Sequence, residues 1–328
     1  MKKALICGIS GQDGGYLAKF LLGKGYEVWG TSRDAELSEF GNLKKLAIRD
    51  QVKVVSMTLV DFRSVLQTLS RTEPDEIYNL AGQSSVGLSF EQPVETLESV
   101  ATGSLNLLES IRFAKLPARL YNASSGECFG NTGGEAADEL TPFRPRSPYA
   151  VAKAAAFWEV ANYREAYGIF ACSGILFNHE SPLRSARFVT RKIAASAARI
   201  AAGSKETLEL GNTSIRRDWG WAEEYVEAMW LMLQQERPDD YVIATGSSDS
   251  LEDFLAAAFE AVGLTWTKHV RVDRGLMRPT DISVSRANPS KALRELDWQA
   301  TQKMHDVARS MVDAERLLLS TGPSRFSR

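Results

Sequence analysis

The segment Ala4-Leu5-Ile6-Cys7-Gly8-Ile9-Ser10-Gly11-Gln12-Asp13-Gly14 decides the fold of this chain. A short apolar run ends at the first of three glycines spaced GxxGxxG, and apolar residues at helical spacing follow from Tyr16 to Leu22. Glycines at these positions permit a tight turn, close approach of the backbone to a phosphate, and close packing of the helix on the strand. The helix N-terminus beyond them supplies free N–H groups and the positive end of a dipole. The segment therefore predicts a dinucleotide-binding turn.

Short β-rich runs alternate with helical segments through the first half of the chain. Strands separated by helices favour a parallel sheet with crossover helices. We therefore predict an α/β fold, a Rossmann-type doubly wound parallel sheet with a smaller C-terminal α/β substrate-binding lobe. The longest early helix is expected over Glu95 to Phe113. The expected strands are Ala4 to Gly8, Tyr26 to Ser32, Val52 to Ser56, Glu76 to Leu80, Arg119 to Ala123 and Phe170 to Phe177.

The pattern changes beyond about residue 178. We expect residues 1–177 to form the dinucleotide-binding domain with the catalytic residues. Residues 178–328 should form mainly a substrate lobe, with the chain crossing back between the two. Two shorter helices are expected to close the chain, and the tail Thr321 to Arg328 should lack regular structure. Expected elements of this half are helices at Phe188 to Ala202, Tyr225 to Leu233 and Ser250 to Val262, and extended segments at Leu208 to Leu210 and Tyr241 to Ala244.

The composition is that of a globular protein with material for a large core. Of 328 residues, 44% are hydrophobic and 24% charged, and the formal net charge is −2. This balance gives no general attraction to nucleic acid or to an anionic membrane, and no stretch reaches the ~18 apolar residues of a membrane span. The three cysteines are widely spaced, as in reduced cytoplasmic proteins, and the three histidines show no zinc-binding spacing with them. We therefore expect a cytoplasmic protein without a metal site.

Tyr149 and Lys153 lie one helical turn apart on the same predicted helix face. A free tyrosine has a pKa of ~10 and is a poor base at neutral pH, but a neighbouring ammonium favours the phenolate and lowers that pKa. Lys153 also suits the ribose hydroxyls of a nicotinamide. Such a pair is common in ordinary helices and does not by itself indicate catalysis. The glycine turn and the preceding Ser147-Pro148 make a catalytic role the better interpretation. Together these features predict an oxidation or a reduction.

The segment Asn122-Ala123-Ser124-Ser125-Gly126-Glu127 follows a predicted strand at its carboxyl end. Ligands bind at this edge of open α/β sheets. Ser125 is able to donate a hydrogen bond to a substrate oxygen that becomes a carbonyl. Serines after a strand also serve as caps or turns. Glu127 adds an acid–base group that simple alcohol oxidation does not require, so it discriminates best between reaction types.

The end of the second predicted strand, Ser32-Arg33-Asp34, bears on the choice of coenzyme. An acidic residue here bonds the ribose 2′-OH of NAD, whereas an arginine accommodates the 2′-phosphate of NADP. Ser32 takes the place of the acid and Arg33 follows it. Arg33 is otherwise a solvated loop charge whose field Asp34 would weaken. The pattern favours NADP.

These motifs resemble those of the extended short-chain dehydrogenases/reductases and, within them, the 4,6-dehydratases that act on GDP-mannose. The resemblance covers nearly the whole chain. The stretch from Asn178 to Lys192 and the RRDWG segment are more specific than the glycine turn. The resembling segments are GISGQDGGYLAKFLLGKGYEV, EIYNLAGQSSVG, PRSPYAVAK, GILFNHESPLR, RFVTRKI, RRDWGWAEEYVEAMWLMLQ and DDYVIATG.

The resemblance implies that a nucleotide sugar is oxidised at carbon 4, loses water across carbons 5 and 6, and is reduced again at carbon 6. It implies NADP rather than NAD, GDP-mannose or a related GDP-sugar as substrate, and a homodimer or homotetramer. The implied catalytic residues are Ser125, Glu127, Tyr149 and Lys153. The implied cofactor contacts are Gly8, Gly11, Gln12, Asp13, Gly14, Arg33, Asp61, Leu80, Ala81, Tyr149, Lys153, His179 and Arg184. The implied substrate contacts are Ser84, Ser125, Glu127, Tyr149, Asn178, Lys192, Arg217, Arg278 and Asp281.

The chain departs from the family pattern at a few positions. The usual Thr-Ser-Glu appears as Ser125-Gly126-Glu127, and the usual Arg-Arg after the second strand appears as Arg33-Asp34. The serine-rich stretch after it is shortened, and Asp281 stands where the family usually has glutamate. These departures bear on coenzyme choice and subunit assembly more than on the chemistry.

Three alternatives remain open from the sequence. A related GDP-sugar such as a heptose would undergo the same chemistry. An epimerase or a 4-ketoreductase on the same scaffold needs the tyrosine and lysine but no carboxylate for elimination, so Glu127 argues against both. A non-catalytic NADP-binding sensor would keep the glycine turn and lose the catalytic pair, which is intact here.

Overall fold

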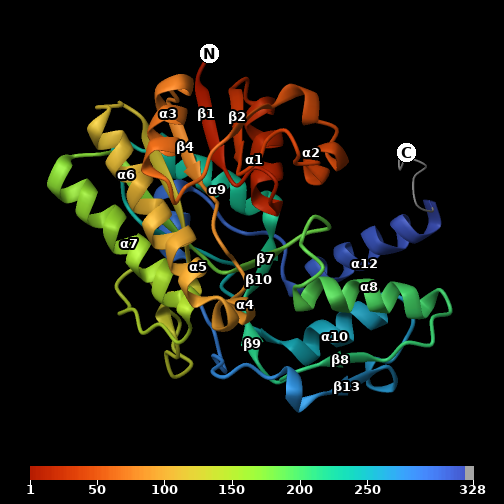
Figure 1. The fold of residues 1–328 in the computed structure, drawn as a ribbon. Coiled ribbons are helices and arrows are strands. Elements are labelled where there is room, and N and C mark those ends of the chain that lie inside the picture. The colour runs from red at the N-terminus through yellow and green to blue at the C-terminus, as the bar shows by residue number, and fades with distance from the viewer. Residues whose placement is uncertain (322–328) are drawn as a thin grey trace.

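The computed structural model describes residues 1–321, so the predicted tail lies outside the described residues from 322 onward. The first lobe is built on a seven-stranded sheet of order β3-β2-β1-β4-β5-β6-β11, with every neighbouring pair parallel (Figure 1). The predicted doubly wound α/β fold is thus confirmed. The strands are β1 (Lys3–Cys7), β2 (Glu27–Ser32), β3 (Lys53–Ser56), β4 (Glu76–Asn79), β5 (Arg119–Ser125), β6 (Ala171–Leu176) and β11 (Tyr241–Ile243).

Helices cover both faces of this sheet, which explains why its strands are apolar without alternation. In β1, Ala4 and Ile6 belong to the core under α1 and α9, whereas Leu5 and Cys7 belong to the core under α3, α6 and α7. All four side chains are fully buried. The helices of this lobe are α1 (Gln12–Gly23), α2 (Gly41–Lys45), α3 (Phe62–Thr72), α4 (Val86–Glu91), α5 (Pro93–Leu97), α6 (Gly103–Phe113), α7 (Pro148–Tyr167), α9 (Ala222–Gln234) and α11 (Ser290–Leu296).

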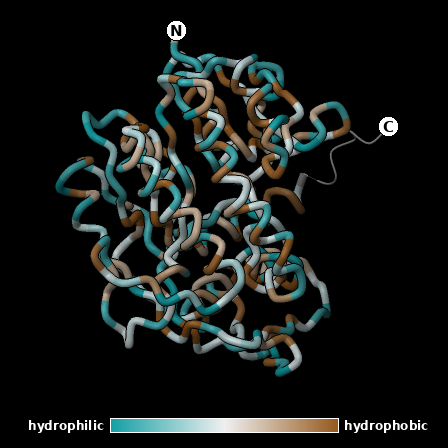
Figure 2. The backbone as a smooth tube through the Cα atoms, turned by 60° about the vertical axis from the view of Figure 1, so that its left-hand side comes forward, coloured by the Kyte–Doolittle hydropathy of each residue, from teal (hydrophilic) through white to brown (hydrophobic). Residues whose placement is uncertain are grey.

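The second lobe has its own core, separate from that of the sheet. Large side chains such as Phe254, Phe259 and Met311 fill the space between α8, α10 and α12, which lie together in Figure 1. Figure 2 shows apolar stretches inside both lobes. The elements here are α8 (Val189–Ala201), α10 (Leu251–Glu260) and α12 (Met304–Thr321), with the paired strands β7 (Asn178–Glu180) and β10 (Trp219–Trp221), β9 (Arg216–Arg217) and β12 (Asp249–Ser250), and β8 (Leu208–Leu210) and β13 (Val270–Val272).

The chain crosses between the lobes several times after residue 178. Helix α9 packs on the first sheet, and β11 extends that sheet by pairing with β6. Helix α11 then returns to the same core through Ala292 and Leu296. We propose that residues 1–177 mainly bind the dinucleotide and that residues 178–328 mainly bind the substrate. In the structure, however, α9, β11 and α11 belong to the first lobe.

Two details differ from the sequence-based expectation. The helix expected over Glu95 to Phe113 contains a π-helical turn, Glu98–Thr102, between α5 and α6. The last helix is not short: α12 has 18 residues, because Met304, Val307, Ala308 and Met311 give it a continuous apolar stripe against the second core. Although α12 is long, no helix within residues 1–321 is apolar and long enough to cross a membrane.

Candidate active site

The carboxyl ends of β4, β5 and β6 and Asp13 at the start of α1 line a cavity of about 390 Å³ that the second lobe closes from the other side. The chain runs outward from β1 to β3 in one direction and from β4 to β6 in the other. The cavity therefore lies where the strand order reverses, the usual ligand site of such sheets. Of the predicted residues, those that line it are Asp13, Leu80, Ser84, Ser125, Glu127, Tyr149, Lys153, Asn178, His179, Arg184, Lys192, Arg217, Arg278 and Asp281.

The glycine turn leaves no room for side chains and suits an anion. Gly8 has a φ of +85°, and a Cβ on it would lie 3.0 Å from backbone atoms of Leu80 and Ala81. A Cβ on Gly14 would lie 2.4 Å from the Gly8 carbonyl oxygen. Helix α1 begins directly after Gly11, and no side chain caps its N-terminus. These free N–H groups suit a dinucleotide diphosphate, while Gly8, Gly11 and Gly14 themselves are not among the residues that line the cavity.

The π-helical turn supports the loop that follows β4. Ser99 Oγ accepts a hydrogen bond from the Gln83 backbone N–H at 3.2 Å. Gly82 has a φ of +114°, and a Cβ on it would lie 2.9 Å from Val100 Cγ2. This contact places Ser84 and the adjacent Ser85 at the cavity wall. A π-helical turn beside a binding loop is a common arrangement at functional sites.

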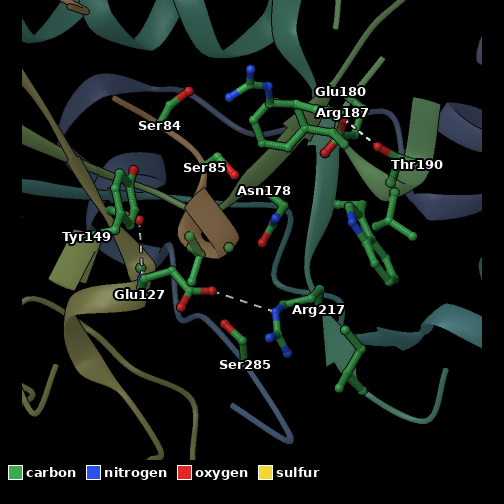
Figure 3. A pocket seen from close by; sticks show the side chains of 18 of the residues that line it. Ser84, Ser85, Glu127, Tyr149, Asn178, Glu180, Arg187, Thr190, Arg217 and Ser285 are labelled. Carbon is green, nitrogen blue, oxygen red and sulfur yellow. Dashed lines mark hydrogen bonds and ion pairs between the residues drawn. The ribbon is translucent and has the colours of Figure 1, made fainter. Parts of the chain in front are cut away.

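Ser125 and Glu127 reach the cavity from the end of β5. The strand ends at Ser125, and a 3-10 turn directs Glu127 into the cavity (Figure 3). Ser125 Oγ accepts a hydrogen bond from the Glu127 backbone N–H at 3.3 Å. Burial raises the pKa of Glu127, and the charges of two arginines oppose only part of the shift. A buried carboxyl with a raised pKa is suited to both give and take a proton near neutral pH.

Gly126 has a packing role where the resembling enzymes usually have serine. A Cβ on Gly126 would lie 2.9 Å from the Phe177 ring. Because Phe177 is buried, the ring has little freedom to yield. The missing side chain at this position therefore allows the close contact between the turn and the residue that follows β6.

Tyr149 and Lys153 are presented by the first turns of α7. Pro148 opens this helix, and the Ser147 side chain caps it. Lys153 Nζ donates a hydrogen bond to the Ala123 carbonyl oxygen at 2.7 Å and lies 5.9 Å from the centre of the Tyr149 ring. Burial lowers the pKa of Lys153 to about 8. Burial also raises the pKa of Tyr149, with a hydrogen bond to Ser125 opposing part of that shift.

Burial therefore outweighs Lys153 in setting the pKa of Tyr149, and the expected role of Lys153 in favouring the phenolate stays a prediction. Desolvation of the phenolate is the largest influence on Tyr149, and the Lys153 ammonium is directed to a backbone carbonyl. The two side chains nevertheless share one wall of the cavity.

Arg217 is buried, and protein acceptors hold most of its guanidinium. Nη1 donates to the carbonyl oxygens of Arg216 and Ile282 at 2.9 and 2.6 Å, and Nη2 donates to Asp281 Oδ1 at 2.8 Å. Its Nε lies 3.8 Å from Glu127 Oε1, and the two side chains point toward one another in Figure 3. Arg217 thus faces the candidate acid and has few donors left for a phosphate.

The other cations of the second lobe are freer. Arg278 Nη1 lies 3.6 Å from the same Asp281 oxygen and is partly exposed, and the Lys192 side chain is exposed. Arg184 pairs with the buried Glu180 at 3.2 Å. An anionic substrate group would therefore meet Lys192 and Arg278 before Arg217.

Arg33 and Asp61 do not line the cavity. Arg33 is exposed in the loop after β2. Asp61 Oδ1 accepts a hydrogen bond from the Arg63 backbone N–H at 2.9 Å and caps α3, which is a structural role that the sequence did not suggest. The predicted Gln12 and Ala81 adjoin cavity residues at the glycine turn and at the end of β4.

Sequence reasoning missed several cavity residues, and the signals for them differ. Arg187 lies in the RFVTRKI segment and reaches the cavity (Figure 3). Because Lys192 in the same segment was predicted to bind substrate, Arg187 could have been predicted with it. Thr190 Oγ1 donates to Glu180 Oε2 at 2.7 Å, a contact across a turn that no local pattern reveals. Asn212 and Ser285 lie in irregular segments with no motif.

The fold and the cavity are those of an extended short-chain dehydrogenase/reductase. The Ser125 hydroxyl, the Tyr149 phenol and the Lys153 ammonium line one cavity beside the glycine turn, and a second lobe covers them. The model of one family within this class, described as GDP-mannose 4,6 dehydratase, matches residues 5–311. The chain belongs to this family, and the family resemblance of the sequence is thus confirmed.

Similar proteins cover nearly the whole chain. GDP-mannose 4,6 dehydratase 1 of Arabidopsis thaliana is 46% identical over 324 residues, covering 96% of this chain and 90% of the relative. The human GDP-mannose 4,6 dehydratase is 41% identical over 346 residues, covering 98% and 93%. Among solved structures, the UDP-glucose 4-epimerase of Thermus thermophilus, in complex with NAD, has a TM-score of 0.84 at 28% identity, covering 96% of this chain and 99% of that one.

Replacing Arg217 with alanine should reduce kcat and not only substrate affinity. The Arg217 charge lowers the pKa of Glu127, so its removal should raise that pKa further. The acidic limb of the kcat–pH profile should then move to higher pH, with kcat reduced about ten- to a hundredfold as the carboxyl loses its fixed neighbour. Steady-state kinetics across pH with GDP-mannose, the sugar named by the family, would measure both effects.

Lys192→Ala is the matched control, because it removes a cation of the same cavity that does not act on Glu127. It should raise KM and leave the acidic limb in place. An Arg217→Ala variant that behaves in the same way would show that Arg217 only binds substrate.

Proposed function

We propose that this protein is a GDP-mannose 4,6-dehydratase that converts GDP-mannose to GDP-4-keto-6-deoxymannose and water. Family membership at 41–46% identity over most of the chain supports the activity and the GDP-sugar substrate. The observation that carries the proposal is the buried Glu127 carboxyl, held in the same cavity as Tyr149 and Lys153. Oxidation alone needs the last two residues, whereas loss of water also needs an acid–base group such as Glu127.

The reaction involves no net oxidation. A nicotinamide dinucleotide held at the glycine turn by the free N–H groups at the start of α1 would supply a hydride acceptor for carbon 4 and a hydride donor for carbon 6. Tyr149 takes the proton of the carbon 4 hydroxyl as a phenolate, which its hydrogen bond to Ser125 favours against burial, and Ser125 also hydrogen-bonds the oxygen that becomes the ketone. The Lys153 ammonium adds positive charge to the same wall of the cavity and so favours the phenolate.

Glu127 acts on the other side of the new ketone. The ketone at carbon 4 makes the proton on carbon 5 acidic, and the Glu127 carboxylate takes it. The resulting carboxylic acid then donates a proton to the hydroxyl that leaves carbon 6 as water. The proton that Tyr149 took from the carbon 4 hydroxyl is returned to carbon 5 through solvent as carbon 6 is reduced, which completes the 4-keto-6-deoxy sugar. The raised pKa of Glu127 suits this double use.

The same geometry weighs against the alternatives. An epimerase or a 4-ketoreductase has no step that needs Glu127, and a non-catalytic sensor has no use for a buried tyrosine–lysine pair. A GDP-heptose would undergo the same chemistry, so it stays an alternative substrate and belongs in the product analysis.

Glu127→Gln should abolish dehydration while oxidation at carbon 4 survives. Glutamine keeps the size of the side chain but has no proton to exchange, so a loss of about 10²–10⁴-fold in product formation is expected. Enzyme-bound NADPH should still form on mixing with GDP-mannose, seen as absorbance during a single turnover, and product is followed by mass spectrometry without added coenzyme.

The exposed carboxylate variant Glu135→Gln serves as the control and should keep wild-type turnover. Dehydration at the wild-type rate by Glu127→Gln would remove Glu127 from the mechanism. Steady consumption of NADPH by the wild-type protein with GDP-mannose would favour a reductase instead.

For the coenzyme we propose NADP in preference to NAD. A nicotinamide dinucleotide is supported by the fold, and NAD is bound in the similar Thermus thermophilus epimerase. The preference is argued from β2, which ends at Ser32 with no carboxylate to bond a ribose 2′-OH. Arg33 follows it in an exposed position from which a guanidinium is free to engage a 2′-phosphate. Asp34 is occupied, because its Oδ1 accepts the backbone N–H groups of Glu36 and Leu37.

Arg33→Ala should weaken NADP binding by about tenfold, the scale of one charge-assisted contact, and leave NAD binding unchanged. Calorimetric titration with each coenzyme measures the two affinities. Arg71→Ala, which removes an exposed charge at the end of α3, is the control. Equal loss of both affinities would contradict the assignment.

We also propose that the protein acts as a homo-oligomer in the cytoplasm. Helices α5, α6 and α7 lie side by side in Figure 1 and carry exposed apolar side chains on one outer layer. A second copy placed on this layer by a two-fold axis would cover the same side chains on both chains. The cytoplasmic location is supported by three buried cysteines, none of them in a disulfide. The exposed apolar side chains are Val94, Leu97, Leu105, Val151 and Trp158.

Trp158→Glu should therefore shift the protein toward monomer in sedimentation measurements, because a buried charge at a two-fold contact is unfavourable in both copies. Leu140→Glu, an exposed apolar residue outside these helices, should leave the mass unchanged. An unchanged mass for Trp158→Glu would exclude this layer as the interface.

A further inference from the structure

The glycine turn contains a carboxylate at the place where an anion would bind. Asp13 lies in the first turn of α1, lines the cavity, and is partly exposed to it. A negative charge at this end of a helix is favourable in itself. Beside a diphosphate, however, it repels the ligand unless another charge compensates for it.

His179, from β7 of the second lobe, supplies the contact that Asp13 needs. Its Nε2 lies 3.0 Å from Asp13 Oδ2, and its Nδ1 lies 2.8 Å from the Phe177 carbonyl oxygen. The imidazole is buried and stacks on the Tyr225 ring with centroids 4.5 Å apart. The ring is therefore fixed, with each nitrogen directed at an oxygen.

Both partners of this ring are acceptors. A backbone carbonyl oxygen cannot donate, so Nδ1 must carry a hydrogen. An aspartate has an ordinary pKa of ~3.9, and the Gln12 Nε2 hydrogen bond and the N-terminus of α1 favour its charged form, so the Asp13 carboxyl is ionised near neutral pH. Nε2 must then carry a hydrogen as well. A ring with hydrogens on both nitrogens is an imidazolium.

Further contacts join the same two segments. Gln12 Nε2 donates to Asp13 Oδ1 at 2.9 Å and to the His179 carbonyl oxygen at 3.1 Å. Ser181 Oγ donates to Gln12 Oε1 at 2.7 Å. The start of α1 is thus tied to the β7 segment with every polar atom of the Gln12 side chain in use.

We propose that His179 is a positioning residue that stays doubly protonated and neutralises Asp13, so that the glycine turn accepts the diphosphate of the coenzyme. The inference rests on the proposed coenzyme site but not on the sugar that reacts there. It gives His179 a task that acts through Asp13 and needs no contact with the coenzyme.

The surroundings of His179 support a lasting positive charge. Burial disfavours the imidazolium, but the Asp13 charge, its hydrogen bond and the Phe177 carbonyl together raise the pKa of His179. The nearby Arg184 opposes this, and its own charge is paired with Glu180. Tyr225 stays neutral because burial raises its pKa far above 10. The contribution to coenzyme affinity is therefore present below the pKa of His179, which is raised from the ordinary value, and is lost as pH rises through it.

Nitrogen NMR of the full chain tests the charge directly. The protein has three histidines, and His179→Gln assigns the signal in question by its absence. An ordinary histidine, with a pKa of about 6.5, is neutral at about pH 8. His179 should still show the shifts of an imidazolium there in the wild type, and should become neutral in Asp13→Asn, which accepts less but keeps the shape. A neutral His179 ring in the wild-type protein at that pH would overturn the proposal.

Binding of NADP, measured by calorimetry at about pH 7 and with no sugar present, tests the consequence. His179→Gln should weaken binding about tenfold, because it leaves the Asp13 carboxylate uncompensated. The double variant Asp13→Asn/His179→Gln should recover most of that loss, since the repelling charge is gone. His305→Gln, at an exposed histidine of α12, is the control. Lys153 also titrates near this range, so the comparison is made at one pH between variants that all retain it.

A double variant that binds NADP as weakly as His179→Gln would show that His179 acts on the coenzyme or the fold by another route, and would overturn the proposal. Unfolding by urea identifies any variant that is merely unstable, and the wild-type NMR result needs His179→Gln only to assign its signal. If the protein did not dehydrate GDP-mannose, the proposed reaction would be wrong. The NMR signal of His179 and the NADP affinities would not change, because neither measurement involves the sugar.

Discussion

The close approach of the glycine turn to the end of β4 is the constraint on which the site depends. A side chain on Gly8 would crowd the backbone of Leu80 and Ala81 and would have to adopt a φ of +85°, and a side chain on Gly14 would clash with the Gly8 carbonyl oxygen. This contact brings the start of α1 to the gap between β1 and β4, where the strand order reverses. The tyrosine, the lysine and the carboxyl then reach the same space from β5 and α7, because parallel strands end at one edge.

Charge inside the cavity is arranged in compensated groups rather than as single ions. Glu127, Arg217 and Asp281 form one alternating series, and Asp13 with His179 forms another. Burying a lone charge is costly, and removing one member of a buried pair leaves the other without compensation. The protonation states of the cavity are therefore properties of groups of residues, which is why Tyr149 and Lys153 do not follow the simple two-residue argument that their spacing suggests.

The sequence predicts those features that are written locally. The sequence predicted the glycine turn, the apolar strands and the start of α7 at Ser147-Pro148, because each of these features depends on residues that are neighbours in the chain. The sequence did not predict the contact between Lys153 and the Ala123 carbonyl or the carbonyls that hold the Arg217 guanidinium, because the fold brings these segments together. It also did not distinguish the capping role of Asp61 from a binding role. The length of α12 could have been predicted from its regular apolar spacing, although the second core that it covers could not.

The repeated crossing of the chain between lobes has a consequence for how such a protein is able to diversify. Because α9, β11 and α11 complete the first core from the far end of the chain, neither lobe is a contiguous module. A cut near residue 177 would leave β6 as an open sheet edge and strip one face of its covering helix. Exchange of a whole substrate lobe would therefore require several separate segments of the chain to be replaced together. Single substitutions in the segments that line the cavity change the contacts with a substrate and leave the packing between the lobes intact.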